Sequence, residues 1–305
     1  MAFLFPGQGS QAVGMGRELA KLYRVAQQTF EEADETLGYK LSQVCWEGPE
    51  EKLRLTKITQ PAILTVSAAA CRVLQEKGLA PAMVAGHSLG EYSAHVAAGT
   101  LSFADAVRTV RNRGRYMQEA VPVGEGAMAA ILGLSSAQVQ QICEESAGEE
   151  VCQPANLNSP DQTVISGSKA AVERAAELAK QRGAKRAVML AVSAPFHCAL
   201  MQPAQDRLAA DLGGLTFHPM RVPVVTNVDG EAVCDPEKAR DALIRQVTGA
   251  VRWEQSVRVL IGRGVESFVE VGPGKVLCGL LRQIERSKSC GNVEDEASLQ
   301  KIVSR

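Results

Sequence analysis

The sequence contains no long apolar run and no basic segment at its start. The apolar part of the opening MAFLFPGQGSQ is too short for a signal peptide, and no stretch approaches the ~18 apolar residues of a membrane span. The formal net charge is only −1, which gives no general attraction to nucleic acid. We therefore expect a cytoplasmic protein that binds neither nucleic acid nor membrane.

Recognisable cysteine patterns are also missing. The eight cysteines form no C-x-x-C and no paired histidine spacing, so the sequence predicts no zinc site. Their scattered positions do not support a disulfide framework, and we expect most of them to be small core residues. With 305 residues and 46% hydrophobic side chains, the chain can bury a sizeable core in roughly two domains.

The segment around Ser88 has the pattern of a nucleophile elbow. A short apolar strand is expected at 83–85 and a helix at 89–98, and Ser88 lies between them with Gly86 and Gly90 two positions to either side. The glycines relieve the crowding of a strand that turns directly into a helix, and this turn exposes the serine hydroxyl. The alternative is an ordinary tight connection without chemistry.

The loop at 6–11 follows an expected strand at 2–5 and matches the pattern G-x-G-x-x-A, so a dinucleotide-binding site has to be considered. Such a fold needs a second strand ending in an acidic residue about 20 residues later, whereas 26–36 is polar and helical. We therefore favour a different use, in which backbone N–H groups of the loop face an oxyanion.

The order of expected strands and helices changes from residue 127 onward, which indicates a separate structural unit. Strands and helices are expected in the order βαββαβ, which is typical of a ferredoxin-like unit. It reads as an insertion of about 70 residues, 125–193, into a larger domain made of 1–124 and 194–305, with the active cleft where the two meet. The strands are expected at 127–132, 151–157, 162–166 and 186–192, and the helices at 135–147 and 169–181.

A serine nucleophile needs a base, and the chain has four histidines. His95 is roughly 10 Å along the helix from Ser88, His87 should point away from the strained turn, and His218 lies in an ordinary connection. His197 follows the insertion beside the expected cleft, so we select it as the base, although a lone histidine is more often structural. Cys198 is a rival nucleophile, but sequence neighbours rarely face each other.

Arg113 lies on the apolar stripe of the helix expected at 103–118, beside Gly114. A buried guanidinium needs a negative partner, because an unpaired buried charge is very costly. That partner is either one of the chain's own carboxylates or a substrate anion.

These motifs together resemble the malonyl-CoA:acyl carrier protein transacylases of bacterial fatty-acid synthesis. The similarity covers nearly the whole chain in order, and GHSLGE alone would also fit the acyltransferase domains of polyketide and animal-type fatty-acid synthases. A free-standing chain favours the discrete enzyme. The matching stretches are FPGQGSQ at 5–11, GHSLGEYSA at 86–94, RNRGRYMQEA at 111–120, NSP at 158–160, HCALM at 197–201, Gln246 and VGPGKVL at 271–277.

The resemblance implies an α/β-hydrolase-like domain with a parallel sheet and a ferredoxin-like insertion. It implies ping-pong transfer of malonyl from coenzyme A to the phosphopantetheine thiol of acyl carrier protein, by a monomer that uses no metal or cofactor. Ser88 would carry the malonyl ester, His197 would be its base, and Arg113 would bind the malonyl carboxylate. The N–H groups of Gln8 and Leu89 would form the oxyanion hole.

Within the same family pattern, Gln246 would contribute to substrate binding and orient His197 through its main-chain carbonyl, so no acidic third member is expected. Phe196 departs from the small residue that many discrete members carry before the histidine. In related synthase domains a phenylalanine there accompanies malonyl over methylmalonyl. Two rival functions remain, a serine hydrolase or thioesterase and a non-catalytic module that binds acyl carrier protein.

The carrier proteins of such systems are generally acidic, so a local basic patch is expected. Lys180, Arg182, Lys185 and Arg186 are the candidates, and the alternative is a solvated helix end. The G-P-G-K stretch at 272–275 lacks the spacing of a phosphate loop and indicates a turn. From residue 286 onward the chain is polar and mixed in charge, and we expect it to be poorly packed.

Overall fold

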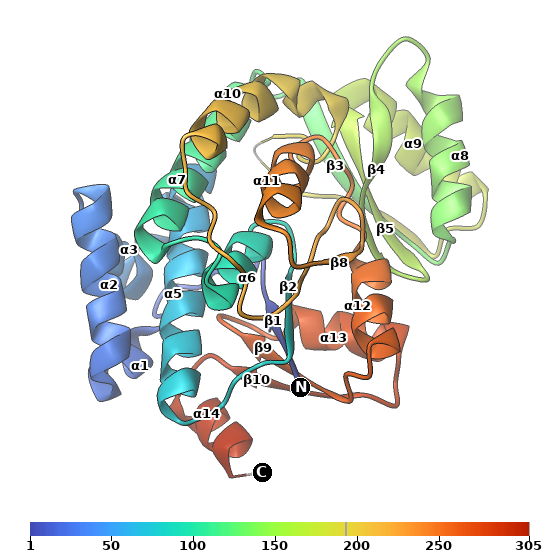
Figure 1. The fold of residues 1–305 in the computed structure, drawn as a ribbon. Coiled ribbons are helices and arrows are strands. Elements are labelled where there is room, and N and C mark those ends of the chain that lie inside the picture. Colours follow the sequence, from blue (N-terminus) through green and yellow to red (C-terminus); the bar gives the residue numbers. More distant parts are fainter. Residues whose placement is uncertain (193, 305) are drawn as a thin grey trace.

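The computed structural model describes residues 1–192 and 194–304 and shows a mixed α/β architecture with two separate sheets (Figure 1). The larger sheet is six-stranded, in the order β10-β9-β1-β2-β7-β8. All its neighbouring strands are parallel except the last pair, β7 and β8. Its strands are β1 Ala2–Phe5, β2 Met83–Gly86, β7 Val224–Val225, β8 Ala232–Val233, β9 Ser267–Val271 and β10 Ser289–Val293.

Helices cover both faces of this sheet, as the near-continuous apolar character of its central strands requires. Phe3 and Phe5 point to one face and pack with α2, α5, α6 and α7, whereas Ala2 and Leu4 point to the other and pack with α12 and α13. The helices of this part are α1 Arg17–Leu22, α2 Arg24–Leu37, α3 Leu41–Glu47, α4 Glu50–Leu53, α5 Thr56–Glu76, α6 Gly90–Ala98, α7 Phe103–Glu119, α10 Gln202–Gly213, α11 Pro236–Arg245, α12 Trp253–Gly262, α13 Val276–Ile284 and α14 Glu296–Val303, with a 3₁₀ turn at Ala199–Met201.

The second sheet is antiparallel and has its own core. Its strand order is β4-β5-β3-β6, and its inner face packs against two helices at the upper right of Figure 1. The chain runs through this part in the predicted order βαββαβ. The elements are β3 Gly126–Leu132, α8 Ser136–Ala147, β4 Cys152–Ser159, β5 Gln162–Ser168, α9 Lys169–Gln181 and β6 Arg186–Met189.

The sequence also predicts a helix at 61–77, with proline in its first turn, and another at 198–212, and the structure differs from both predictions. The helix placed at 61–77 begins five residues earlier, at Thr56, so Pro61 lies inside α5 rather than in its first turn. Nearly every residue of α5 from Ile58 to Leu74 is buried, and this packing outweighs the hydrogen bond that proline cannot make. The helix expected from 198 begins as the 3₁₀ turn and becomes α10 only at Gln202.

The prediction of a poorly packed tail is wrong. β10 extends the large sheet beside β9, and α14 buries Leu299 against the core. The apolar residues of this segment are too widely spaced to stand out in the sequence, but a parallel edge strand and one amphipathic helix need only a few of them.

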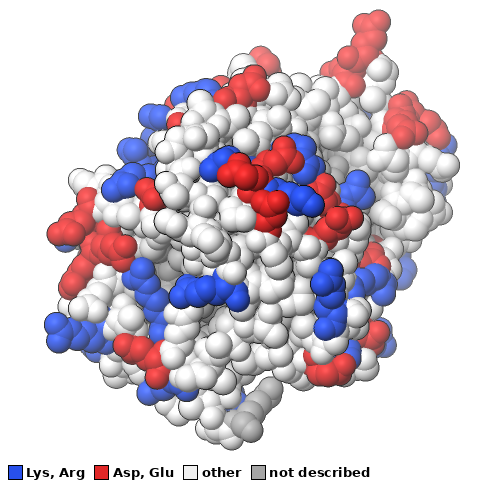
Figure 2. All heavy atoms as spheres, in the orientation of Figure 1, with Lys and Arg blue, Asp and Glu red and all other residues white. Residues whose placement is uncertain are grey.

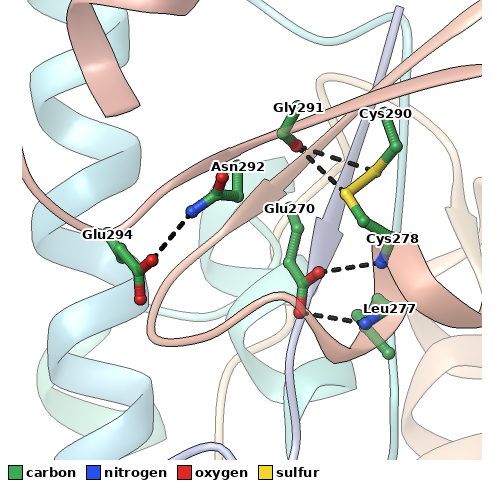
Figure 3. The surroundings of a disulfide bond; sticks show 7 residues. All are labelled: Glu270, Leu277, Cys278, Cys290, Gly291, Asn292 and Glu294. Carbon is green, nitrogen blue, oxygen red and sulfur yellow. Dashed lines mark hydrogen bonds between the residues drawn. A yellow bond between two sulfur atoms is a disulfide. The ribbon is translucent and has the colours of Figure 1, made fainter. Parts of the chain in front are cut away.

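The prediction of no disulfide is also wrong, because Cys278 and Cys290 are bonded (Figure 3). Cys278 lies in the first turn of α13 and Cys290 in β10, which follows α13 and pairs with β9. The turn from β9 into α13 is held by Glu270, whose carboxylate accepts from the backbone N–H groups of Leu277 and Cys278. This packing, which no sequence spacing reveals, brings the two sulfurs together. Five of the other cysteines are buried, as predicted, and Cys234 is exposed.

Acidic and basic side chains are interspersed over the face drawn in Figure 2, in keeping with the small net charge. No helix in the described part of the chain is long and apolar enough to cross a membrane. Within residues 1–192 and 194–304, no three His, Cys, Asp or Glu side chains are grouped to hold a metal ion.

Candidate active site

Ser88 lies between β2 and α6 with its backbone in the left-handed region, at a φ of 52°. A β-carbon at Gly86 would lie 1.9 Å from the backbone of Gly90, and one at Gly90 would lie 2.0 Å from the carbonyl oxygen of Phe5. Only glycine fits at either position, as the elbow interpretation predicts. The strained serine is thereby presented at the carboxyl ends of β1 and β2, where ligands bind in open α/β sheets.

His197 is the histidine that reaches Ser88. Its Nε2 lies 2.7 Å from Ser88 Oγ, a hydrogen-bond distance between groups that are 109 residues apart in the chain. His197 is also strained, at a φ of 60°, and its side chain is only 3% exposed. Two strained residues therefore meet in a geometry suited to a nucleophile and its base.

The tautomer of His197 follows from the partners of its other nitrogen. Nδ1 lies 2.8 Å from the carbonyl oxygen of Gln246 and 3.2 Å from that of Gly249, and a carbonyl oxygen can only accept. Nδ1 therefore carries the proton, and Nε2 accepts from the Ser88 hydroxyl. Burial, followed by the nearby Arg113 guanidinium, lowers the pKa of His197 to about 3, which keeps the ring neutral.

The other three histidines and Cys198 do not contact the Ser88 side chain. His87 Nε2 bonds Asn158 Oδ1 at 2.8 Å, and His95 is buried on α6 beside Glu91. His218 is exposed. The Cys198 thiol donates to the carbonyl of Pro195, and burial raises its pKa, so it is not poised as a thiolate.

Arg113 lies on the buried side of α7 and is only 2% exposed. Its Nη2 donates to Ser88 Oγ at 3.2 Å and to Gln246 Oε1 at 2.9 Å, and its Nη1 donates to Gln60 Oε1 at 2.9 Å. A β-carbon at Gly114 would lie 2.6 Å from the backbone of α5, so glycine permits the close helix contact beside Gln60. Within the described residues Arg113 forms no ion pair with a carboxylate, which leaves its charge without a direct counter-ion.

Two backbone N–H groups near Ser88 are free in the part of the chain that the structure describes. Neither the N–H of Gln8, in the loop after β1, nor that of Leu89, at the start of α6, donates a hydrogen bond there. Both residues line the same pocket as Ser88 and His197. Paired free donors beside a nucleophile are suited to stabilise negative charge on a carbonyl oxygen.

A pocket of about 130 Å³ is lined by residues from the parts of the chain that carry the two sheets. Gln8, Ser88 and Arg113 come from the part with the large sheet, whereas Met128 and Asn156 come from the antiparallel sheet. Met117, Leu190, Val192 and Phe196 supply an apolar wall. The arrangement suits a short acyl group that ends in an anion.

Three residues of the site were not predicted from the sequence, namely Gln60, Glu91 and Asn227. Asn227 Oδ1 accepts the Ser88 N–H at 2.6 Å, and its Nδ2 donates to the carbonyl of Gly86 at 2.7 Å. Two signals were available. Asn227 follows β7 at the carboxyl end of the sheet, and Glu91 belongs to the elbow motif itself.

The predicted basic patch lies at the end of α9 and the start of β6. Lys180 pairs with Glu177 and Arg182 with Glu145, so half of its charge is already neutralised. Lys185 and Arg186 are exposed and form no ion pair within the described residues.

The chain is similar to known proteins over nearly its full length. The signature of the family described as "Acyl transferase domain" matches residues 2–303. The chain is 55% identical to the malonyl CoA-acyl carrier protein transacylase of Escherichia coli strain K12 over 284 residues, which are 93% of this chain and 92% of that one.

Solved structures agree along their whole length. An acyl carrier protein S-malonyltransferase from Vibrio cholerae superposes with a TM-score of 0.97 at 52% identity and 99% coverage of both chains. A malonyl-transacylase in complex with its type II polyketide synthase acyl-carrier protein also gives 0.97, at 49% identity, covering 99% of this chain and 98% of that one.

Proposed function

The chain belongs to the acyl transferase family, and from this premise we propose that it transfers malonyl from coenzyme A to acyl carrier protein in fatty-acid synthesis. One observation carries the choice of malonyl. The pocket that holds the Ser88 hydroxyl also holds Arg113, a buried cation without a carboxylate partner among the described residues. A thioester whose acyl group ends in a carboxylate supplies that partner.

In the first half-reaction Ser88 Oγ attacks the thioester carbonyl of malonyl-CoA while His197 Nε2 takes the hydroxyl proton. The carbonyl oxygen becomes negative and faces the N–H groups of Gln8 and Leu89. The C–S bond then breaks, His197 returns the proton to the coenzyme A thiolate, and a malonyl ester remains on Ser88.

The second half-reaction reverses these roles. The phosphopantetheine thiol of acyl carrier protein loses its proton to His197 and attacks the ester carbonyl. The C–O bond to Ser88 breaks, and His197 protonates the serine oxygen. Two carbonyl acceptors for Nδ1, those of Gln246 and Gly249, hold the imidazole in the required tautomer, which supports a dyad without an acidic third member.

Arg113→Ala should remove malonyl transfer without removing acyl transfer as such. Leaving one member of a desolvated charge pair without its partner costs roughly 2–5 kcal/mol, or on the order of 30- to several-thousand-fold in kcat/KM for malonyl-CoA. Acetyl-CoA, which has no carboxylate, should react as well as before or better. The measurement is kcat/KM for both thioesters on wild type and variant.

Arg108→Ala is the matched control, because Arg108 lies on the same helix, is exposed and pairs with Asp105. It should change neither value by more than about 2-fold. Equal losses for malonyl- and acetyl-CoA in a folded Arg113→Ala protein would make Arg113 a structural residue and would remove the main support for malonyl.

For the carrier protein we propose a docking patch of Lys185 and Arg186, the two exposed cations near β6 that have no ion pair within the described residues. Attraction between an acidic carrier and this patch is screened by salt. Raising ionic strength should therefore slow transfer to the carrier protein more than acylation by malonyl-CoA. Equal salt sensitivity of the two half-reactions, measured separately by rapid quench, would contradict this docking site.

We further propose that the chain has two domains. Residues 1–124 and 194–305 form an α/β-hydrolase-like domain, and residues 125–193 form a ferredoxin-like insertion. The strand order β4-β5-β3-β6 and the element order βαββαβ support the second description. The boundary at Ser193 and the terminal Arg305 lie outside the described residues. A cytoplasmic monomer without cofactors fits this proposal.

A further inference from the structure

Glu91 is a buried carboxylate three residues after the nucleophile. It lies in the first turn of α6, and its side chain is 0% exposed. Oε2 accepts from Gln246 Nε2 at 2.7 Å and from the Asn227 N–H at 2.9 Å. No step of the proposed reaction uses it, although both of its partners contact the machinery.

The first contact determines which way the Gln246 amide faces. Gln246 Nε2 also donates to the Ser88 carbonyl at 3.0 Å, and both a carbonyl and a carboxylate oxygen can only accept. The amide oxygen must then point to the opposite side, where it accepts from Arg113 at 2.9 Å. A reversed amide would set two donors against each other, so Glu91 and the Ser88 carbonyl together fix the orientation in which Gln246 can hold Arg113, and the bond to Glu91 is the shorter of the two.

The second contact leads to the backbone of the nucleophile. The same Asn227 that donates its N–H to Glu91 accepts the Ser88 N–H through its side chain. Glu91 therefore supports the elbow from one side through Asn227 and the guanidinium from the other through Gln246.

The charged groups around Glu91 also link it to Arg113. Burial raises the pKa of Glu91 to about 7, and among charged groups Arg113 opposes this rise. Asp229 adds to the rise, and His95, whose Nε2 lies 4.0 Å from Glu91 Oε1, is kept neutral by its own burial, which lowers its pKa to about 3. The amide of Gln246 thus stands between the Arg113 cation and the Glu91 anion and bonds to both.

We propose that Glu91 is a positioning residue that orients Arg113 for the substrate carboxylate through the side-chain amide of Gln246. The inference rests on the proposed malonyl transfer. It assigns an acidic member to the site, two hydrogen bonds removed from the guanidinium that binds the substrate carboxylate.

The test is a double-mutant cycle read out as the ratio of kcat/KM for malonyl-CoA to that for acetyl-CoA, at pH 8. The variants are Glu91→Gln, Gln246→Ala and the double variant, and the main-chain carbonyl that bonds His197 is retained in all of them. Glu270→Gln is the matched control, because Glu270 is equally buried but, among the residues that the structure describes, its carboxylate accepts from backbone N–H groups of α13 and not from the site. Thermal unfolding identifies any variant that is not folded.

Glu91→Gln removes the negative charge but keeps one oxygen that can accept, so the hydrogen bond from Gln246 loses its charge assistance and the malonyl-to-acetyl ratio should fall about 10-fold. In the Gln246→Ala background the same change should alter the ratio less than about 3-fold, because the connection is already broken. Glu270→Gln should leave the ratio unchanged. Glu91→Asp withdraws the carboxylate by one methylene, should give the same loss, and replaces Glu91→Gln if that variant does not fold.

An unchanged ratio in folded Glu91→Gln or Glu91→Asp would overturn the inference. So would an equal loss of ratio with and without the Gln246 side chain, because Glu91 would then act by another route. Wild type is assayed in parallel and tests the proposed function separately. A wild-type enzyme that does not transfer malonyl refutes that function. A malonyl-selective wild type whose malonyl-to-acetyl ratio does not depend on Glu91 refutes only the role proposed for Glu91.

Discussion

Ser88→Ala should leave no malonyl ester on the protein and no measurable transfer to acyl carrier protein. The hydroxyl is the only group within hydrogen-bond distance of His197 Nε2 among the described residues, so no other nucleophile is available to the base. Removing the nucleophile from a serine enzyme typically costs about 10⁶-fold in kcat. Intact-mass measurement after incubation with malonyl-CoA, together with a carrier-protein transfer assay, checks the result.

Ser93→Ala is the matched control for this change, because Ser93 is a buried serine on α6, the helix that follows Ser88, and is not among the described residues that line the pocket of His197. It should acylate like wild type. A malonyl label that persists on Ser88→Ala, on Cys198 or on any other residue, would show that the nucleophile has been assigned wrongly.

His197→Ala should slow both half-reactions by roughly 10²–10⁴-fold, the usual cost of losing a general base. Acylation loses the acceptor of the serine proton, and discharge loses the acceptor of the thiol proton. The fold should survive, since the ring is held by two main-chain carbonyls at the edge of the pocket. Single-turnover rates for each half-reaction provide the test, and acylation at the wild-type rate near pH 7 would mean that another base acts.

The pH profile should separate His197 from Glu91. The base must be neutral, and since its pKa is lowered to about 3, activity that depends on it is lost only as pH falls far below 6.5. Glu91, with a pKa raised to about 7, is the buried site group that changes charge near neutrality. Loss of malonyl kcat/KM between pH 8 and 6 should therefore disappear in Glu91→Gln. A loss near pH 6.5 that persists in that variant would show that His197 titrates normally.

Local pattern was enough to predict the glycine-flanked turn at Ser88, the contact between Ser88 and His197, and the element order βαββαβ. Gly86 and Gly90 signal a turn that only glycine permits, and four histidines leave few choices for a base. Helix 169–181 was predicted to the residue, because Gly183 and an alternation of alanine and charge define it. Such features depend on neighbours within a few positions, which a single sequence displays directly.

Contacts between distant segments could not be predicted in the same way. Asn227 reaches Ser88 across 139 residues and Gln60 reaches Arg113 across 53. The position of Asn227 after β7 indicates the site but not its partner, and Gln60 carries no local signal. The Cys278–Cys290 bond and the packing of α14 likewise depend on where β10 joins the sheet. The absence of a carboxylate beside Arg113 within the described residues is also a property of the folded chain alone, and it is what separates a substrate site from a structural ion pair.

Mass spectrometry of the wild-type protein through both half-reactions tests the central claim most directly. Incubation with malonyl-CoA should add one malonyl group, which peptide mapping places on Ser88 and which persists in the absence of acyl carrier protein. Adding the phosphopantetheinylated carrier should return the protein to its original mass and transfer the malonyl group to the carrier. A malonyl group released as free malonate at the same rate with or without the carrier would identify a hydrolase instead, and the absence of any adduct would contradict the account altogether.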